Sequence, residues 1–233
     1  MSIKYTIVFQ NDNRKDGHYA FFVDPPQVSG PLTASDVFTN AWISAFVPNG
    51  GKHDITTTCE TFAWCGTVSK RPCVGVTVHE GVSQPAALGY EEDKETTPGG
   101  TFEMIVDRGV PDLIPIPSSA KTAAYKIETG SDLPTPNCKY LFGLGMTDGC
   151  GLVSPVASAL AANNMSINLT PIMRFHVSQS DAETGEIIDL PSISKKAGVI
   201  DFSSGPGAGK DAATVVHQNN GTFDIKYYDN CKN

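Results

Sequence analysis

The sequence predicts an all-β fold, an antiparallel β-sandwich or a flattened barrel, that forms a single domain over residues 1–233. Three observations support this prediction: apolar residues recur with a period of two, turn residues separate the alternating runs, and the composition is globular. Hydrophobic residues make up 40% of the chain and charged residues 18%, which excludes a disordered chain and a membrane protein. Sandwiches and barrels of this length often form one unit, and no internal repeat or change in composition marks a boundary.

The first strand shows the pattern most clearly. Tyr5, Ile7 and Phe9 alternate with more polar neighbours, and the run ends at three turn-forming residues, 11–13. A second strand over 19–23 ends at two prolines. At spacings of roughly ten residues, as in sandwiches and barrels, further strands are predicted over 37–47, 54–59, 61–68, 74–80, 101–107, 122–127, 139–144, 171–178, 198–202, 213–217 and 222–228.

Three segments do not follow the strand pattern. Residues 155–162 contain four alanines, which favour a helix, but the same segment also alternates, so helix and strand both stay open. Residues 91–100 are acidic and end in Pro-Gly-Gly, and residues 203–210 are rich in serine and glycine. We expect both to be exposed loops.

The charge balance limits the partners. The net charge is −8, and an acidic surface repels phosphate backbones, so we expect no nucleic-acid partner. No window approaches 18 consecutive apolar residues, so we expect no membrane span. The N-terminus runs directly into a strand pattern without the regions of a signal peptide.

Six cysteines predict disulfide bridges, with reduced thiols as the alternative. They pair in 15 possible ways, and the sequence does not select one. No C-x-x-C pair is present and no histidine lies near a cysteine pair, so we expect no metal site. Cys138 and Cys150 flank a glycine-rich turn and are predicted to form one bridge, worth about 3 kcal/mol in the chain-entropy model. Cys231 is predicted to pair with Cys59, Cys65 or Cys73.

Three N-glycosylation sequons start at Asn164, Asn168 and Asn220. Together with the cysteines they predict N-glycans and passage through the secretory pathway, or secretion. The missing signal peptide conflicts with this location. We expect that the sequence is a mature or engineered form with a new start; a cytosolic protein with free thiols is the alternative.

The familiar catalytic motifs fail on inspection. The tail 207–210 (Gly-Ala-Gly-Lys) lacks the first glycine of a phosphate-binding loop, and Asp211 stands where that loop needs Ser or Thr. No nucleophile elbow and no H-E-x-x-H motif occurs, and no cofactor is predicted. Among five separated histidines, His79 and His176 flank apolar alternation and are the better candidates for acid–base chemistry.

Residues 59–80 hold the densest chemistry. Rings beside cations in a cysteine-rich segment could line a pocket for a flat, oxygenated ligand, with the rings stacking on it and the cations donating to its carbonyls. The alternative is an ordinary core with a solvated turn at 69–72. The candidate catalytic residues are Arg71, Lys70 and His79, and the candidate substrate-binding residues are Trp64, Phe62, Trp42 and Tyr19.

Residues 4–11, 19–22 and 25–30, with 184–189 and 194–196 later in the chain, resemble a group of small fungal β-sandwich proteins. The likeness covers most of the chain but consists of framework residues. With its cysteines and sequons, the chain is similar to the fungal hetero-Diels–Alderases of tropolone–sesquiterpene biosynthesis. No motif transfers their catalytic positions residue by residue.

This resemblance implies a cofactor-free pericyclase that joins a tropolone quinone methide to a humulene-type sesquiterpene by [4+2] cycloaddition. Such a reaction needs an apolar cavity that holds two small molecules in a near-attack geometry, and a donor on the quinone-methide carbonyl would lower its barrier. The alternatives are a secreted lectin-like or ligand-binding sandwich protein without catalysis, and a structural protein without a small-molecule site. The enzyme predicts a closed apolar pocket of several hundred Å³ with few polar groups, whereas a lectin predicts a shallow exposed groove with aromatic faces and Asn/Asp clusters.

Overall fold

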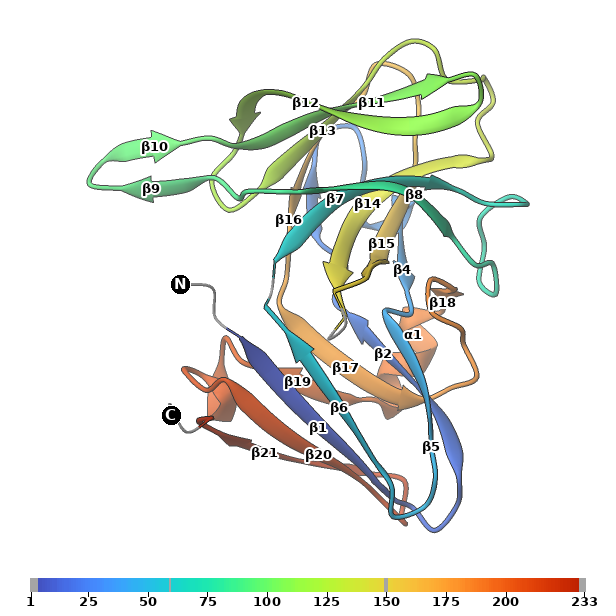
Figure 1. Ribbon diagram of the computed structural model, residues 1–233, viewed down its shortest axis with the longest axis vertical. Helices are drawn as coiled ribbons and strands as arrows, with labels where there is room; N and C mark the ends of the chain where they lie inside the picture. The colour runs from blue at the N-terminus through green and yellow to red at the C-terminus, as the bar shows by residue number, and fades with distance from the viewer. Residues whose placement is uncertain (1–3, 59, 149–150, 231–233) are drawn as a thin grey trace.

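The computed structural model describes residues 4–58, 60–148 and 151–230, and in these residues the chain is almost entirely β-structure. Four open sheets and one isolated hairpin account for the strands. The all-β prediction is therefore confirmed. No sheet closes into a barrel among the described residues, and the open sheets pack face to face (Figure 1).

Two four-stranded sheets form the lower half of the molecule in Figure 1. The first, in the order β21-β20-β1-β6, consists of Phe223–Tyr228, Ala212–Gln218, Tyr5–Asp12 and Lys52–Thr57. The second, in the order β19-β17-β2-β5, consists of Gly198–Asp201, Arg174–Gln179, Gly17–Val23 and Ile43–Val47. Aromatic rings join them: the centroid of Phe9 on β1 lies 4.5 Å from Tyr19 and 5.6 Å from Phe21, both on β2.

Two larger sheets form the upper half. The five-stranded sheet β12-β11-β13-β16-β3 consists of Val110–Ala120, Gly99–Asp107, Tyr125–Thr129, Ser166–Thr170 and Gln27–Ser29. The six-stranded sheet β18-β4-β15-β14-β7-β8 consists of Ile187–Ile188, Val37–Asn40, Val153–Leu160, Tyr140–Thr147, Thr61–Thr67 and His79–Pro85. The Tyr125 hydroxyl on β13 donates to the carbonyl of Gly143 on β14 at 2.9 Å, so the two sheets are in direct contact.

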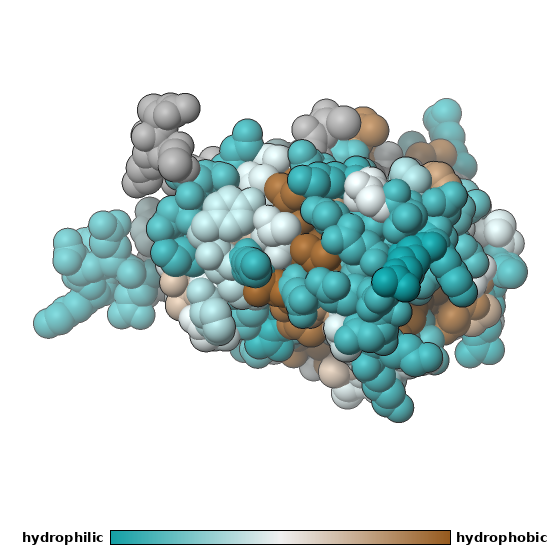
Figure 2. Space-filling model, turned by 90° about the horizontal axis from the view of Figure 1, so that it is seen from below, coloured by the Kyte–Doolittle hydropathy of each residue, from teal (hydrophilic) through white to brown (hydrophobic). Residues whose placement is uncertain are grey.

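One cluster of buried side chains includes residues from all four sheets, for example Ile7, Phe21, Met104 and Phe142. The division of the chain into a single domain stays a prediction. The end of the molecule seen from below in Figure 2 is mainly hydrophilic, with a narrow apolar strip among polar side chains.

β14 shows why the middle of the six-stranded sheet is so apolar. Leu141 packs in one cluster with Trp64, whereas Phe142 and Leu144 belong to the main core, so both faces of the strand are covered. At Gly143 an added Cβ would lie 2.0 Å from the carbonyl oxygen of Ala157 on β15. Only glycine lets the two strands approach this closely.

The structure corrects several predicted elements. The predicted strand 37–47 is two strands, β4 and β5, which lie in different sheets. The predicted strand 74–80 consists of a turn at 74–75 and a loop with an isolated β-bridge between Thr77 and Glu186, and β8 begins at its end. The predicted loop 91–100 contains the β9–β10 hairpin (Tyr90–Glu92 and Glu95–Thr97), which projects at the left of Figure 1. The ambiguous segment 155–162 is a strand over most of its length, within β15.

The sequence did not predict four further strands, β3, β12, β16 and β18, nor two parallel pairings. β12 contains three prolines, which weaken the alternating pattern of a strand in the sequence. The prolines are tolerated there because β12 is an edge strand. β16 falls on the two adjacent sequons. The sheets are mainly antiparallel, but β1–β20 and β11–β13 pair in parallel.

No two of the described cysteines, Cys65, Cys73 and Cys138, form a disulfide bridge with one another. Cys65 is buried, and Cys73 and Cys138 are exposed thiols. Predicted bridges that involve Cys59, Cys150 or Cys231 have an end outside the described residues. The disulfide part of the fold prediction is therefore not shown by the structure.

Candidate functional site

The candidate site is an open groove of about 520 Å³ at the β18 edge of the six-stranded sheet. Three segments that are distant in sequence form it: the 3₁₀ turn η1 (Ala34–Asp36) with β4, the loop 72–74, and β18 with the start of helix α1 (Leu190–Ile193). Its volume lies within the range of small-molecule sites. The lining residues are Pro25, Ala34, Ser35, Val37, Phe38, Thr39, Pro72, Cys73, Val74, Ile187, Ile188, Asp189, Leu190 and Pro191.

Backbone pairing fixes two walls of the groove. β18 pairs antiparallel with β4, so Ile188 lies opposite Thr39. The loop that follows β7 is held on the other side of β18: the N–H of Gly75 donates to the carbonyl of Ile187 at 3.0 Å, and the N–H of Ile187 donates to Val76 at 2.9 Å. The loop with Cys73 therefore has a fixed base although its tip is exposed.

A capping box shapes the third wall. The Asp36 carboxylate accepts from the Thr33 hydroxyl at 2.6 Å and from its backbone N–H at 2.8 Å, which closes the turn η1. The hydrogen bond from the Thr33 side chain, followed by that from its backbone, lowers the pKa of Asp36. Asp36 thus stays ionised, and the turn carries Ala34 and Ser35 to the groove.

The groove is chiefly apolar, with four polar side chains: Ser35, Thr39, Cys73 and Asp189. Ser35 shares a 2.8 Å hydrogen bond with Thr33. The Asp189 carboxylate accepts from the N–H of Ser192 at 3.4 Å at the start of α1. The site can bind an apolar molecule and offers hydroxyl, thiol and carboxylate groups to it.

None of the predicted catalytic residues lines this groove, and β8, which begins at His79, lies at the opposite edge of the sheet from β18. Lys70 and Arg71 are exposed in the turn immediately before Pro72, and His79 is exposed at the start of β8. From the segment 59–80, the groove is lined by Pro72, Cys73 and Val74, and not by the rings or cations that were expected to line a pocket. The catalytic roles of Lys70, Arg71 and His79 stay predictions.

The predicted substrate-binding rings lie mainly in the core. Tyr19 and Trp64 are 0% exposed and Trp42 is 1% exposed, and Phe62 is half-buried on β7. None of the four lines the groove. Trp64 supports the groove wall from behind, because it packs in one apolar cluster with Ile187, which lines the groove.

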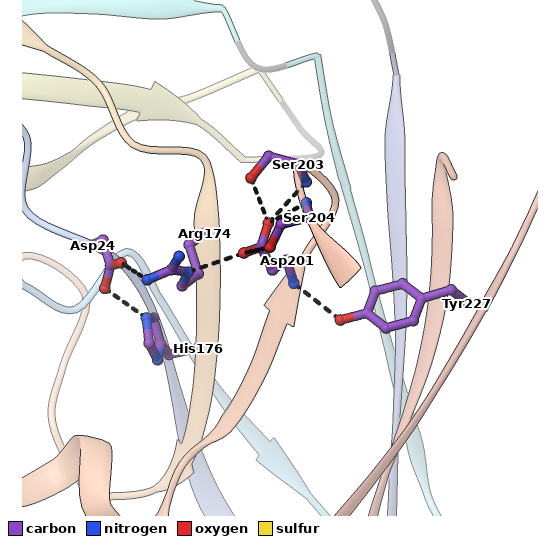
Figure 3. Close-up of polar contacts among 7 residues, drawn as sticks. All are labelled: Asp24, Arg174, His176, Asp201, Ser203, Ser204 and Tyr227. Atoms are coloured by element: carbon purple, nitrogen blue, oxygen red, sulfur yellow. Dashed lines mark hydrogen bonds and ion pairs between the residues drawn. The ribbon is translucent and has the colours of Figure 1, made fainter. Parts of the chain in front are cut away.

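Figure 3 shows a second polar centre, outside the groove lining. Arg174 on β17 bridges two carboxylates: its Nη1 lies 3.1 Å from Asp24 and its Nε 3.2 Å from Asp201. Asp24 directly precedes Pro25, which lines the groove. The ion pairs are partly exposed, so each contributes little on its own, but the shared arginine makes them a network.

Asp201 is the most heavily hydrogen-bonded carboxylate of this network. It accepts from the N–H and hydroxyl of Ser203 at 2.8 and 2.6 Å and from the hydroxyl of Ser204 at 2.8 Å. Burial alone would raise its pKa, but the donors on Ser203, Ser204 and Arg174 hold the pKa of Asp201 well below its usual range. The N–H of Asp201 in turn donates to the Tyr227 hydroxyl, which ties β19 to β21 (Figure 3).

His176 connects this network to the groove. Its Nε2 lies 2.7 Å from Asp24, and its ring stacks on Phe22 with centroids 5.0 Å apart. Phe22 belongs to the same apolar cluster as Ile188 and Leu190, which line the groove. The buried Nδ1 of His176 has no hydrogen-bond partner among the described residues.

A buried His–Tyr pair lies in the lower half. His217 on β20 contacts the Tyr19 hydroxyl at 2.8 Å and the Asn13 amide at 3.1 Å, and it stacks on Phe223. Burial lowers the pKa of His217 and raises the pKa of Tyr19 to about 12. Both groups are neutral at pH 7, so the pair serves packing and hydrogen bonding.

The described residues contain no group of three His, Cys, Asp or Glu side chains placed to hold a metal ion. Nor does any helix of the described chain have the length and apolar character needed to cross a membrane.

Comparison with known protein families matches residues 2–228 to the RhiA family. The chain belongs to the RhiA family. No curated protein and no solved structure matches it. The RhiA match includes all four sheets and every residue of the groove, so the groove is part of the family domain.

Proposed function

We propose that this RhiA-family protein is a cofactor-free pericyclase that catalyses an intermolecular hetero-Diels–Alder reaction between a tropolone quinone methide and a humulene-type sesquiterpene. The family membership suggests a Diels–Alderase-type function. The observation that carries the proposal is the mainly apolar groove of about 520 Å³, which offers few polar groups. A lectin-like site would present aromatic faces and clustered Asn and Asp, and Phe38 and Asp189 alone of the lining residues are of those types.

The groove would act mainly by positioning. Binding in the groove removes the apolar surface of both partners from water, which favours binding. Holding their reacting atoms close lowers the activation barrier of the cycloaddition. Val37, Phe38 and Ile188 supply apolar surface for such contacts. The groove has the expected size and few polar groups, but it is open, whereas a closed pocket was expected for the enzyme.

The polar groups would act on the tropolone partner. A hydroxyl of Ser35 or Thr39 can donate to the quinone-methide carbonyl and withdraw electron density as the ring forms. The Asp189 carboxylate can accept the ring-hydroxyl proton and pass it to the departing hydroxyl of the hydroxymethyl group, which leaves as water; the ring C–CH2 bond becomes double and the quinone methide forms. Lys70 and Arg71 lie next to Pro72 at the groove and are additional candidate donors.

The decisive experiment incubates the purified glycoprotein with a hydroxymethyl-tropolone and a humulene-type alkene and follows the stereochemistry of the adduct. A single stereoisomer formed above the uncatalysed rate supports the proposal. A racemic adduct at the uncatalysed rate refutes it, and saturable binding without turnover would favour the ligand-binding alternative.

One variant separates the two chemical steps. Asp189→Asn retains an oxygen that can cap α1 but removes the base. We expect slower formation of adduct from the hydroxymethyl precursor and an unchanged rate from a quinone methide generated independently. An equal loss with both substrates would contradict the base role of Asp189.

The proposed location is the secretory pathway, on the basis of the sequons. Asn164 and Asn220 are exposed in turns, whereas Asn168 lies half-buried on β16 with its side-chain oxygen bound to the N–H of Lys121 at 3.0 Å. We expect N-glycans at Asn164 and Asn220. Mass spectrometry of peptides from protein made in a eukaryotic secretory host would detect them.

A further inference from the structure

The outer edge of β21 has the properties of a pairing surface. β21 ends the sheet β21-β20-β1-β6 and lies at the lower left margin of Figure 1. The N–H of Gln218 donates to the carbonyl of Thr222 at the hairpin turn. Hydrogen-bonded pairs alternate along an antiparallel ladder, so Asp224 and Lys226 bond to β20 through their backbones. The backbone groups of Phe223, Ile225 and Tyr227 therefore point outward.

The side chains of β21 divide into two faces. Phe223, Ile225 and Tyr227 are half-buried and pack toward the core, whereas Asp224 and Lys226 are exposed. Asp224 accepts one hydrogen bond, from Gln218 at 2.8 Å. Lys226 makes no ion pair with any residue that the structure describes.

We propose that β21 is the interface of a homodimer, in which the β21 strands of two copies pair antiparallel across a two-fold axis at Ile225. Three backbone pairs would then form: Ile225 with Ile225, and Phe223 with Tyr227 in both directions. Each outward N–H and C=O of the strand gains a partner, and one sheet continues through both copies.

Charge selects this register. With Ile225 at the axis, Asp224 of each copy lies directly opposite Lys226 of the other. These residues form non-hydrogen-bonded pairs, in which the side chains approach most closely. A shift that centres the axis on Asp224 opposes two aspartates, and one that centres it on Lys226 opposes two lysines, so both neighbouring registers are disfavoured.

The edge strand β12 differs from β21 in its proline content. β12 also ends a sheet, but it carries prolines at 111, 115 and 117, which obstruct pairing with another strand. β21 has no proline along its six residues. Its interface is short compared with obligate dimers, so the proposed dimer is one that dissociates on dilution.

The test uses sedimentation velocity on the full chain over a concentration series. We expect the unmodified protein to shift from monomer to dimer as its concentration rises. Lys226→Glu places a glutamate opposite Asp224 at both pairs, and Asp224→Lys places a lysine opposite Lys226 at both pairs. Each variant is expected to raise the dissociation constant of the dimer about tenfold or more. Mixing the two variants restores both opposite-charge pairs and is expected to restore dimers.

Recovery on mixing cannot arise from misfolded protein, and thermal melts of each variant alone check folding. Glu92→Lys, on the exposed β9 strand, is the matched control and is expected to leave association unchanged. A monomer at every concentration would overturn the proposal. So would a dimer that both variants leave intact, or two weakened variants that do not recover when they are mixed.

Discussion

Val74→Ser tests whether the groove binds apolar substrate. Val74 lines the groove, and 60% of its surface is exposed in the free protein. Full burial of a valine side chain is worth about 1.5–3 kcal/mol, so covering this exposed part with ligand would contribute about 1–2 kcal/mol. The substitution is therefore expected to raise KM about five- to thirtyfold. The free energy of unfolding should hardly change, because the side chain is already exposed.

Val110→Ser is the matched control for this experiment. Val110 is 63% exposed, but it lies at the start of β12 and does not line the groove. Steady-state kinetics of both variants with the terpenoid partner varied would give the two KM values. Equal effects of the two substitutions, or no effect of Val74→Ser at any terpenoid concentration, would show that the groove is not the apolar binding site.

Three further predictions concern stability and modification. Asp201→Asn should lower the free energy of unfolding by about 2 kcal/mol at pH 7. Because folding lowers the pKa of Asp201, the difference in unfolding free energy between the two proteins should shrink in denaturant melts below about pH 4. Folding lowers the pKa of His217, so the unmodified protein loses stability as the pH falls through about 6.5, the pKa of histidine in the unfolded chain. His217→Gln should therefore flatten the pH dependence of stability between about pH 7 and 5. Glycopeptide analysis should find higher occupancy at Asn164 and Asn220 than at Asn168, and the reverse order would contradict the exposure argument.

Much of the fold follows from periodicity, and its failures have physical causes. β1 and β20 alternate, and their positions were predicted closely. The position of β7 was also predicted closely, although most of its residues are buried in succession. The run 37–47 looked continuous because two strands of different sheets are separated by only two residues, Ala41 and Trp42. Short edge strands such as β3 and β18 carry too few residues for a period to show.

The site was predicted only in part, because its walls come from three distant segments. Of the residues singled out in 59–80, Cys73 alone lines the groove, beside Pro72 and Val74, and the rings and cations of that segment do not. Nothing local indicated that η1 and β18 would complete the groove, since β18 is placed by its pairing with β4. Trp42 and Trp64 fit an aromatic pocket by residue type, but large rings are also the usual fillers of a sandwich core, and that is where the structure places them.

The groove and the β21 edge lie on different sheets, and this separates their roles. The groove is formed at the β18 edge of the six-stranded sheet, whereas β21 ends a four-stranded sheet. One contact between their surroundings is the Tyr227 hydroxyl, which accepts from the N–H of Asp201, the residue that also binds Arg174. Lys226 takes no part in that chain of contacts, so a protein held monomeric by Lys226→Glu should keep the KM of the unmodified protein. A rise in KM that follows the loss of dimer would instead mean that dimerisation through β21 supports the groove.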